Sequence, residues 1–218
     1  VHAVAGCELA TLMLVPALDG TGLTLQAIEP QSGSTSVTMR SSFDMTRPVA
    51  DVGFTAAPAT ELARGADAEA AVRAGLLAGG AMLASEQVGL AEWCLESTVA
   101  YTKQRNQFGR PIGSFQALKH RMARLWIAVN SARAAARNAA VLADAGGDEA
   151  AVAVGLAQAY CSDVAVLAAE ECVQLHGGIG MTWEHPAHLY LKRAKADQVA
   201  LGTAAHHRVV LAEGLTPT

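Results

Sequence analysis

The chain has 218 residues, 51% of them hydrophobic, which is enough for a core in one large domain or two smaller ones. It carries 16 basic and 20 acidic residues, and the formal net charge of -4 argues against nucleic acid or an acidic membrane surface as a partner. No apolar run approaches the roughly 20 residues of a membrane span, and the first residues lack the pattern of a signal peptide. The cysteines have no CxxC spacing, which disfavours a zinc site or a disulfide framework and predicts a cytoplasmic protein: Cys7, Cys94, Cys161 and Cys172.

Residues 1–57 consist of short extended segments separated by Gly, Ser, Asp and Pro. Within them Leu23, Leu25 and Ala27 alternate with Thr24 and Gln26, which is the period of a β-strand. About four strands fit into this length, too few to close a barrel. We therefore expect a small antiparallel β unit that is covered by helices or belongs to a sheet begun upstream.

The composition changes near residue 58, where we place the start of a second domain that runs to residue 218. Its first helix is predicted to begin with Asp67 as a cap and to end near residue 104. Leu76, Leu83 and Leu90 lie seven residues apart on one face of this helix. The pattern indicates a long helix that packs along that face.

A second long helix is predicted after a cap at Ser114, because apolar residues recur there at steps of three and four. They are Phe115, Leu118, Met122, Leu125 and Val129. A third helix, over residues 148–175, is apolar nearly all round, which is typical of a central helix. Shorter helices are expected from residue 185 and over residues 203–213.

These elements together predict a mainly α fold. Residues 58–218 should form an antiparallel up-and-down four-helix bundle, and residues 1–57 should form the small antiparallel β unit that precedes it. Many alanines and 20 glycines fit this fold, because small side chains let helix axes approach closely.

The turn between the first two long helices is a candidate binding site for an anionic, flat ligand. Arg105 offers fork-shaped donors to phosphate oxygens, Phe108 can stack on a ring, and Gln116 lies in the following helix, whose N-terminus favours anions. Taken alone, an exposed arginine and a buried phenylalanine in a tight turn explain the same residues. A ligand site and a plain turn both remain open here.

The glycine-rich loop after Gln174 is a second candidate. Gly177 and Gly178 permit close approach of backbone amides to a ligand, although a glycine cluster at a helix end is more often a C-cap. His185 and His188 have metal-like spacing, but no third ligand is evident, so no metal site is expected.

The segments RNQFGRPIGSFQ and QLHGGIGMTWEHP, together with SSFDMTRPVADVGF, resemble the acyl-CoA dehydrogenase family. The resemblance implies the end of that family's middle β domain followed by its C-terminal helical bundle. The family's N-terminal helical domain and the first half of its β domain have no counterpart in this sequence.

The resemblance also implies FAD as the cofactor, bound across a subunit interface of a dimer or tetramer. Arg105 matches the arginine at the FAD diphosphate, and Thr203 matches a threonine near the flavin. The remaining matched positions lie along the cofactor or at its adenosine end: Phe108, Gln116, Gln174, Gly177 and Gly178.

The family reaction requires a glutamate that removes a Cα proton while a hydride leaves Cβ for the flavin. At the usual position of this base the sequence has Leu201, and the alternative position, on the first long helix, is Gly79. This pattern resembles the subunits of actinobacterial heteromeric acyl-CoA dehydrogenases of steroid degradation that lack the base. The leading hypothesis is therefore a half-site subunit that acts on an acyl-CoA thioester within a homo- or hetero-oligomer.

Two alternatives remain open. The chain is a homomeric dehydrogenase if a displaced carboxylate, such as Glu86 or Glu92, serves as the base. It is a helical interaction module if it binds no flavin. Steroid, branched and straight-chain acyl groups are all compatible with the sequence.

Overall fold

The computed structural model describes residues 1–31 and 33–215. Contacts divide the chain into two compact units, Val1–Leu76 and Leu77–Thr218, and the division falls inside helix α1 (Ala66–Gln104). The predicted boundary at residue 57 lies earlier than this division. The β unit continues past residue 57 because strand β6 (Thr60–Arg64) pairs with β3 (Gly22–Ile28).

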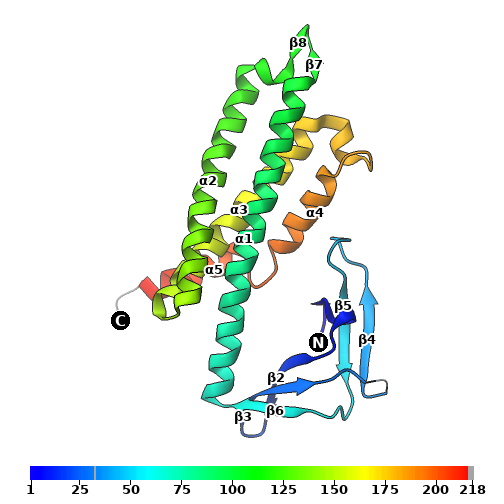
Figure 1. The fold of residues 1–218 in the computed structure, drawn as a ribbon, viewed down its shortest axis with the longest axis vertical. Coiled ribbons are helices and arrows are strands. Elements are labelled where there is room, and N and C mark those ends of the chain that lie inside the picture. Colours follow the sequence, from blue (N-terminus) through cyan, green and yellow to red (C-terminus); the bar gives the residue numbers. More distant parts are fainter. Residues whose placement is uncertain (32, 216–218) are drawn as a thin grey trace. The chain divides into compact units, whose positions relative to one another are not determined.

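The described part of the first unit contains six strands rather than the four expected (Figure 1). They form two three-stranded antiparallel sheets, in the orders β1-β5-β4 and β2-β3-β6. Besides β3 and β6, the strands are β1 (Val4–Ala5), β2 (Met13–Asp19), β4 (Thr35–Arg40) and β5 (Val49–Phe54), and a short 3-10 helix η1 (Cys7–Leu9) follows β1. A small core of Cys7, Ala50 and Val52 supports the first sheet.

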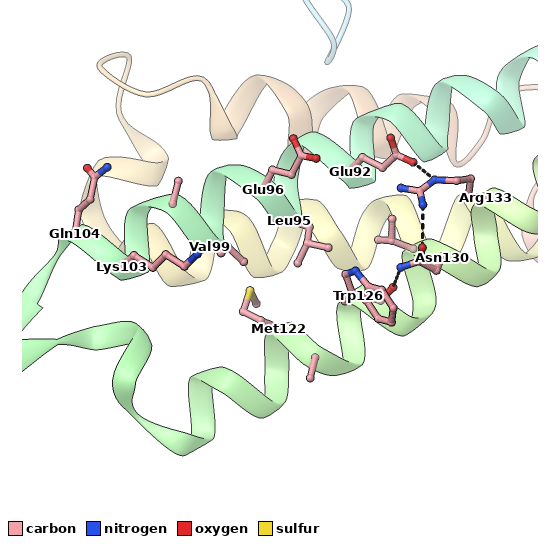
Figure 2. Close-up of a pocket in the computed structure, with 13 residues that line it drawn as sticks. Glu92, Leu95, Glu96, Val99, Lys103, Gln104, Met122, Trp126, Asn130 and Arg133 are labelled. Carbon is pink, nitrogen blue, oxygen red and sulfur yellow. Dashed lines mark hydrogen bonds and ion pairs between the residues drawn. The ribbon is translucent and has the colours of Figure 1, made fainter.

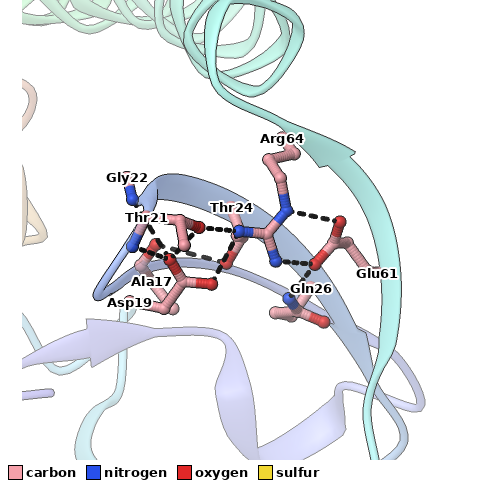
Figure 3. A network of polar contacts seen from close by, with 8 residues as sticks. All are labelled: Ala17, Asp19, Thr21, Gly22, Thr24, Gln26, Glu61 and Arg64. Atoms are coloured by element: carbon pink, nitrogen blue, oxygen red, sulfur yellow. Dashed lines mark hydrogen bonds and ion pairs between the residues drawn. The ribbon is translucent and has the colours of Figure 1, made fainter.

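An exposed polar network ties β6 to the turn between β2 and β3 (Figure 3). Arg64 contacts Asp19 at 2.8 Å and Glu61 at 2.6 Å, and it also donates to the hydroxyl of Thr21. Hydrogen bonds from Thr21, and then from Arg64, hold the pKa of Asp19 well below its usual value. The network fixes the end of the β unit immediately before α1 begins.

The second unit is the predicted helical bundle, with three long helices side by side (Figure 1). They are α1, α2 (Gln116–Ala145) and α3 (Asp148–His176), joined by the strands β7 (Asn106–Gln107) and β8 (Arg110–Pro111) and the turn η2 (Ile112–Ser114). After α3 come η3 (Gly177–Met181), α4 (Ala187–Asp197) and α5 (Ala204–Leu215). The helices predicted from the sequence are confirmed within a few residues.

The capping predictions are corrected by the structure. Helix α1 already begins at Ala66, so Asp67 lies inside its first turn, where its charge still favours the helix dipole. Phe115 rather than Ser114 occupies the N-cap position of α2, and the Ser114 hydroxyl instead donates to the carbonyl of Pro111 at 2.7 Å.

Helix α3 is the central element, as its all-round apolar pattern predicted, and it packs against α2, α4 and α5. By length and composition alone, the segment Asp148–Met181 also satisfies the criteria for a membrane span, which the sequence reading had missed. Its most apolar window is 61% buried inside the bundle, as expected for a core helix. All four cysteines are buried free thiols.

Candidate functional site

The hairpin of β7 and β8 presents an aromatic side chain at its tip. Phe108 and Gly109 form the two-residue turn, with φ of 54° and 74°, the left-handed geometry that tight hairpins need. Phe108 is 89% exposed, contrary to the buried side chain of the plain-turn reading. Phe115 supports it edge-on at 6.1 Å between ring centroids, and Arg110 lies 4.0 Å above the Phe115 ring. A large apolar side chain in this exposed position is available to a ligand or a neighbouring subunit.

The glycine loop closes the C-terminal end of α3. Gly177 adopts a φ of 65° and donates its backbone N–H to the carbonyl of Gln174, so it acts as a C-cap. Gly180 has no room for a side chain, because a Cβ there would lie 2.7 Å from the carbonyl oxygen of Val173. The same loop nevertheless leaves Gly177 and Gly178 exposed, so the cap and a ligand-binding role are compatible.

The two motifs meet at one cavity of about 850 Å³ within the bundle unit. It is lined by five of the seven residues predicted to bind the cofactor: Arg105, Phe108, Gln174, Gly177 and Gly178. The sequence separates the two groups by some 70 positions, and α1 and α3 bring them to the same end of the bundle. The prediction that both motifs share one site is consistent with this placement.

The charged side chain that lines the cavity is positive. Arg105 contributes a permanent positive charge, and none of the described residues that line the cavity is acidic. Its other walls are mostly apolar and aromatic, including Phe115 and Tyr101. A guanidinium, aromatic rings and bare glycine backbone fit a flat, anionic dinucleotide.

Two predicted residues lie outside this cavity. Gln116, the first residue of α2, is exposed and does not line it. Thr203 lies just before α5, where its hydroxyl accepts the backbone N–H of His206 at 3.2 Å. Thr203 therefore caps a helix in this chain. A contact between Thr203 and the cofactor would involve a part of the cofactor that lies outside this cavity.

His176 and Tyr101 also line the cavity, and sequence reasoning did not select them. Their rings stack at 4.4 Å between centroids. His176 stands inside the QLHGG segment, and Tyr101 lies one helical turn before Arg105. Both residues stand in or beside the motifs, but their contact depends on how α1 and α3 pack.

The two positions at which the resemblance places a catalytic base also meet. A Cβ added to Gly79 would lie 3.2 Å from Cδ1 of Leu201. Leu201 has a left-handed backbone, with φ of 55°, and is followed by Gly202 at 104°. Neither residue has a group that can accept a proton, and the two lie next to each other at the positions where the resemblance places the base.

The alternative bases are held in ion pairs. Glu86 on α1 contacts Arg193 of α4, with 2.6 Å between Oε1 and Nε. Glu92 contacts Arg133 of α2 at 2.6 Å, at the edge of a separate groove of about 700 Å³ between α1 and α2 (Figure 2). Each glutamate thus has a partner that links helices, and neither lines the cavity of Arg105.

No group of three His, Cys, Asp or Glu side chains in the described part of the chain is arranged to hold a metal ion. His185 and His188 both lie among aromatic rings instead. His185 is 6.2 Å from Trp93, and His188 is 4.6 Å from Trp183, between ring centroids.

Comparison with known proteins identifies the family. The family model described as the acyl-CoA dehydrogenase C-terminal domain matches residues 69–216. The chain belongs to the acyl-CoA dehydrogenase family. The match covers the whole bundle and with it the cavity of Arg105 and Gln174.

Individual acyl-CoA dehydrogenases are similar over most of the chain. The acyl-CoA dehydrogenase IpdE2 of Mycolicibacterium smegmatis is 41% identical over 195 residues, which are 89% of this chain and 55% of IpdE2. The ChsE4-ChsE5 complex from Mycobacterium tuberculosis has a chain that superposes with a TM-score of 0.87 at 28% identity, covering all of this chain and 59% of that one. Butyryl-CoA dehydrogenase from Megasphaera elsdenii shares the fold, with a TM-score of 0.91 at 24% identity over 98% of this chain and 58% of its own. The chain therefore spans a little over half the length of these relatives.

Proposed function

We propose that this chain is an FAD-dependent subunit for the α,β-dehydrogenation of an acyl-CoA thioester, and that it lacks the catalytic base. The observation that carries the proposal is that Leu201 and Gly79 lie side by side, with 3.2 Å between Leu201 Cδ1 and a Cβ built on Gly79, because these are the two positions at which the resemblance places the base. A dehydrogenase of this family needs a carboxylate at the substrate Cα, and neither residue supplies one.

Residues of the cavity provide the means to hold the cofactor. Arg105 neutralises the diphosphate, and the backbone at Gly177 and Gly178 admits close approach of the nucleotide. FAD, when bound, supplies the acceptor for the hydride. The chain's own part is to orient the dinucleotide and to keep water from one of its faces.

The exposed Phe108 supports a cofactor shared between subunits. A side chain that is 89% exposed contributes little to its own chain, whereas contact with a neighbouring subunit or its ligand removes its apolar surface from water. Gln116 and Thr203 lie outside the cavity, which fits a dinucleotide that extends over more than one chain. We infer a dimer or tetramer with FAD at the interface.

A sister subunit would supply the missing glutamate. The ChsE4-ChsE5 structure is a complex of two different proteins, and its similarity to this chain supports a heteromeric assembly. Each pair of subunits would then hold one competent site, with this chain completing the cofactor pocket. The proposal leaves the acyl group open among steroid, branched and straight-chain thioesters.

The test is to purify the full-length protein alone and together with a paralogue that carries the glutamate, sought first in the neighbouring gene. We expect flavin absorbance in the mixed assembly and turnover of acyl-CoA with an artificial electron acceptor only when both subunits are present. Turnover by the protein alone, at a rate comparable with that of the mixture, would refute the half-site assignment. Absence of bound flavin in every assembly would instead favour an interaction module.

A homomeric enzyme with a displaced base is the second candidate, and one observation favours it. Glu86 lies seven residues after Gly79, about two helical turns along the same face of α1. If Glu86 is the base, turnover by the protein alone should fall by at least about a hundredfold in Glu86→Gln. The ion pair with Arg193 gives Glu86 a structural role without this assumption.

A further inference from the structure

The groove of about 700 Å³ between α1 and α2 has an apolar floor and an accessible aromatic wall (Figure 2). Trp126 of α2 is 59% exposed, and the exposed side chains of Ala100 and Ala123 are too small to cover the groove. Apolar residues of both helices form the floor: Leu95, Val99, Met122 and Val129. Accessible aromatic and apolar side chains gathered in this way are typical of a surface that binds another protein.

The charged side chains that line the groove are of two kinds. Glu92 and Arg133 contact each other at 2.6 Å, so each has its partner within the chain. Glu96 and Lys103 are both exposed, and neither makes a hydrogen bond or an ion pair with any residue that the structure describes. They lie seven residues apart on one face of α1, which is two turns or about 10.5 Å along the helix. The α1 wall of the groove therefore carries one free negative and one free positive charge.

This arrangement of charges is complementary to itself. A second copy, turned by 180° about an axis perpendicular to α1, places its α1 antiparallel to the first. Lys103 of the second copy then comes opposite Glu96, and Glu96 of the second copy comes opposite Lys103. The axis passes midway between the two charges, at the level of Val99 and Ala100. Because Ala100 is small and exposed, two α1 helices can approach closely where they cross.

We propose that the groove between α1 and α2 is a two-fold interface between two copies of this chain, with reciprocal ion pairs of Glu96 and Lys103 on either side of Ala100. Burial of Trp126 supplies the apolar part of the contact. No residue that lines the groove also lines the cavity of Arg105, so the interface does not depend on the proposed cofactor. An assembly with a sister subunit would therefore contain two copies of this chain, joined through α1.

The first test places a cysteine at the two-fold axis of the full-length protein. A short bis-maleimide should join two copies of the Ala100→Cys protein, which denaturing gel electrophoresis detects as a dimer band. The four native cysteines are buried and should not react. Ala140→Cys is the matched control, because Ala140 is exposed on α2 and does not line the groove, and it should give no dimer band. No cross-linking of Ala100→Cys, or equal cross-linking of both proteins, would overturn the proposed interface.

The second test exchanges the charges in the Ala100→Cys protein. Glu96→Lys or Lys103→Glu brings like charges together twice in the two-fold pair, so each should lower the yield of cross-linked dimer about tenfold at limiting protein concentration. An equimolar mixture of the two variants should recover the yield, because a chain with two lysines then meets a chain with two glutamates. The protein with both substitutions should recover it as well. Unchanged yields in the single variants would refute the ion pairs. Losses that neither the mixture nor the double variant recovers would show that the groove holds a partner other than a second copy.

Discussion

Gly79 and Gly80 are neighbours on α1, and we expect their replacement by alanine to shift stability in opposite directions. Alanine in place of glycine inside a helix gains about 1 kcal/mol from backbone entropy alone. The two sites therefore start from the same gain. What the new Cβ touches decides the sign of the change in the free energy of unfolding.

At Gly80 the new Cβ would lie 2.7 Å from Cγ1 of Val154 on α3, closer than a carbon–carbon contact allows. Val154 is 4% exposed and β-branched, so its side chain cannot turn away within the packed core. Overpacking of this kind costs about 1–3 kcal/mol, which outweighs the helix gain. We expect Gly80→Ala to lower the free energy of unfolding by up to about 2 kcal/mol.

At Gly79 the nearest atom is the tip of Leu201, 3.2 Å from the new Cβ. Leu201 is 45% exposed, so its terminal methyl can move by a few tenths of an ångström into solvent. Most of the helix gain should survive, and we expect Gly79→Ala to raise the free energy of unfolding by up to about 1 kcal/mol.

The measurement is urea unfolding followed by the helical signal in circular dichroism. Gly89→Ala is the matched control, because Gly89 lies on the same helix and no atom comes within 4 Å of a Cβ there. It reports the helix gain without a packing term. A Gly80→Ala protein as stable as the Gly89→Ala protein would show that α1 and α3 do not approach as closely as described.

Three further predictions concern charge. Arg105→Ala should weaken FAD and ADP binding by at least tenfold in calorimetry while leaving FMN less affected, and equal affinities would remove Arg105 from the phosphate site. In the proposed assembly with a sister subunit, Glu86→Gln and Glu92→Gln should each retain turnover within about threefold, because their ion pairs are structural. A hundredfold loss of turnover in steady-state assays would identify a base instead. Burial, followed by neighbouring imidazoles, holds the pKa of His185 and of His207 below the usual 6.5, so the unfolded chain binds protons more readily and stability should fall as pH drops below about 6.5. Urea midpoints that do not move between pH 7.5 and 5.5 would contradict this reasoning.

The fold was largely accessible from the sequence, because helical periodicity is a local signal. The long helices follow from apolar residues at steps of three and four, and the central place of α3 follows from its apolar surface. The helix N-caps were harder to predict from the sequence. Ser114 has a side chain that can cap a helix, but it is the last residue of the turn η2, where its hydroxyl donates a hydrogen bond to the carbonyl of Pro111. The extent of the β unit was also missed, since the pairing of β6 with β3 is a long-range contact.

The same contrast between local sequence signals and long-range contacts applies to the candidate site. Arg105 and the glycine loop stand in motifs, so the sequence alone selects them. Their meeting at one cavity depends on how α1 and α3 align, and no local pattern reports that alignment.

Under the half-site proposal, the turn at Leu201 explains how the fold would persist without the base. Gly202 fixes the backbone there, because a Cβ would lie 2.9 Å from the ring of His206 and 3.0 Å from that of His207, and its φ of 104° disfavours any other residue. Thr203 then caps the N-terminus of α5, because its hydroxyl accepts a hydrogen bond from the backbone N–H of His206. Both constraints act on positions after Leu201, and Leu201 itself has a left-handed φ of 55°, so three consecutive backbone positions set the path of the chain here. Under the half-site proposal, leucine in place of glutamate removes the proton acceptor, but both side chains are unbranched at Cβ and the backbone constraints stay the same, so the subunit would still fold and complete a neighbour's cofactor site.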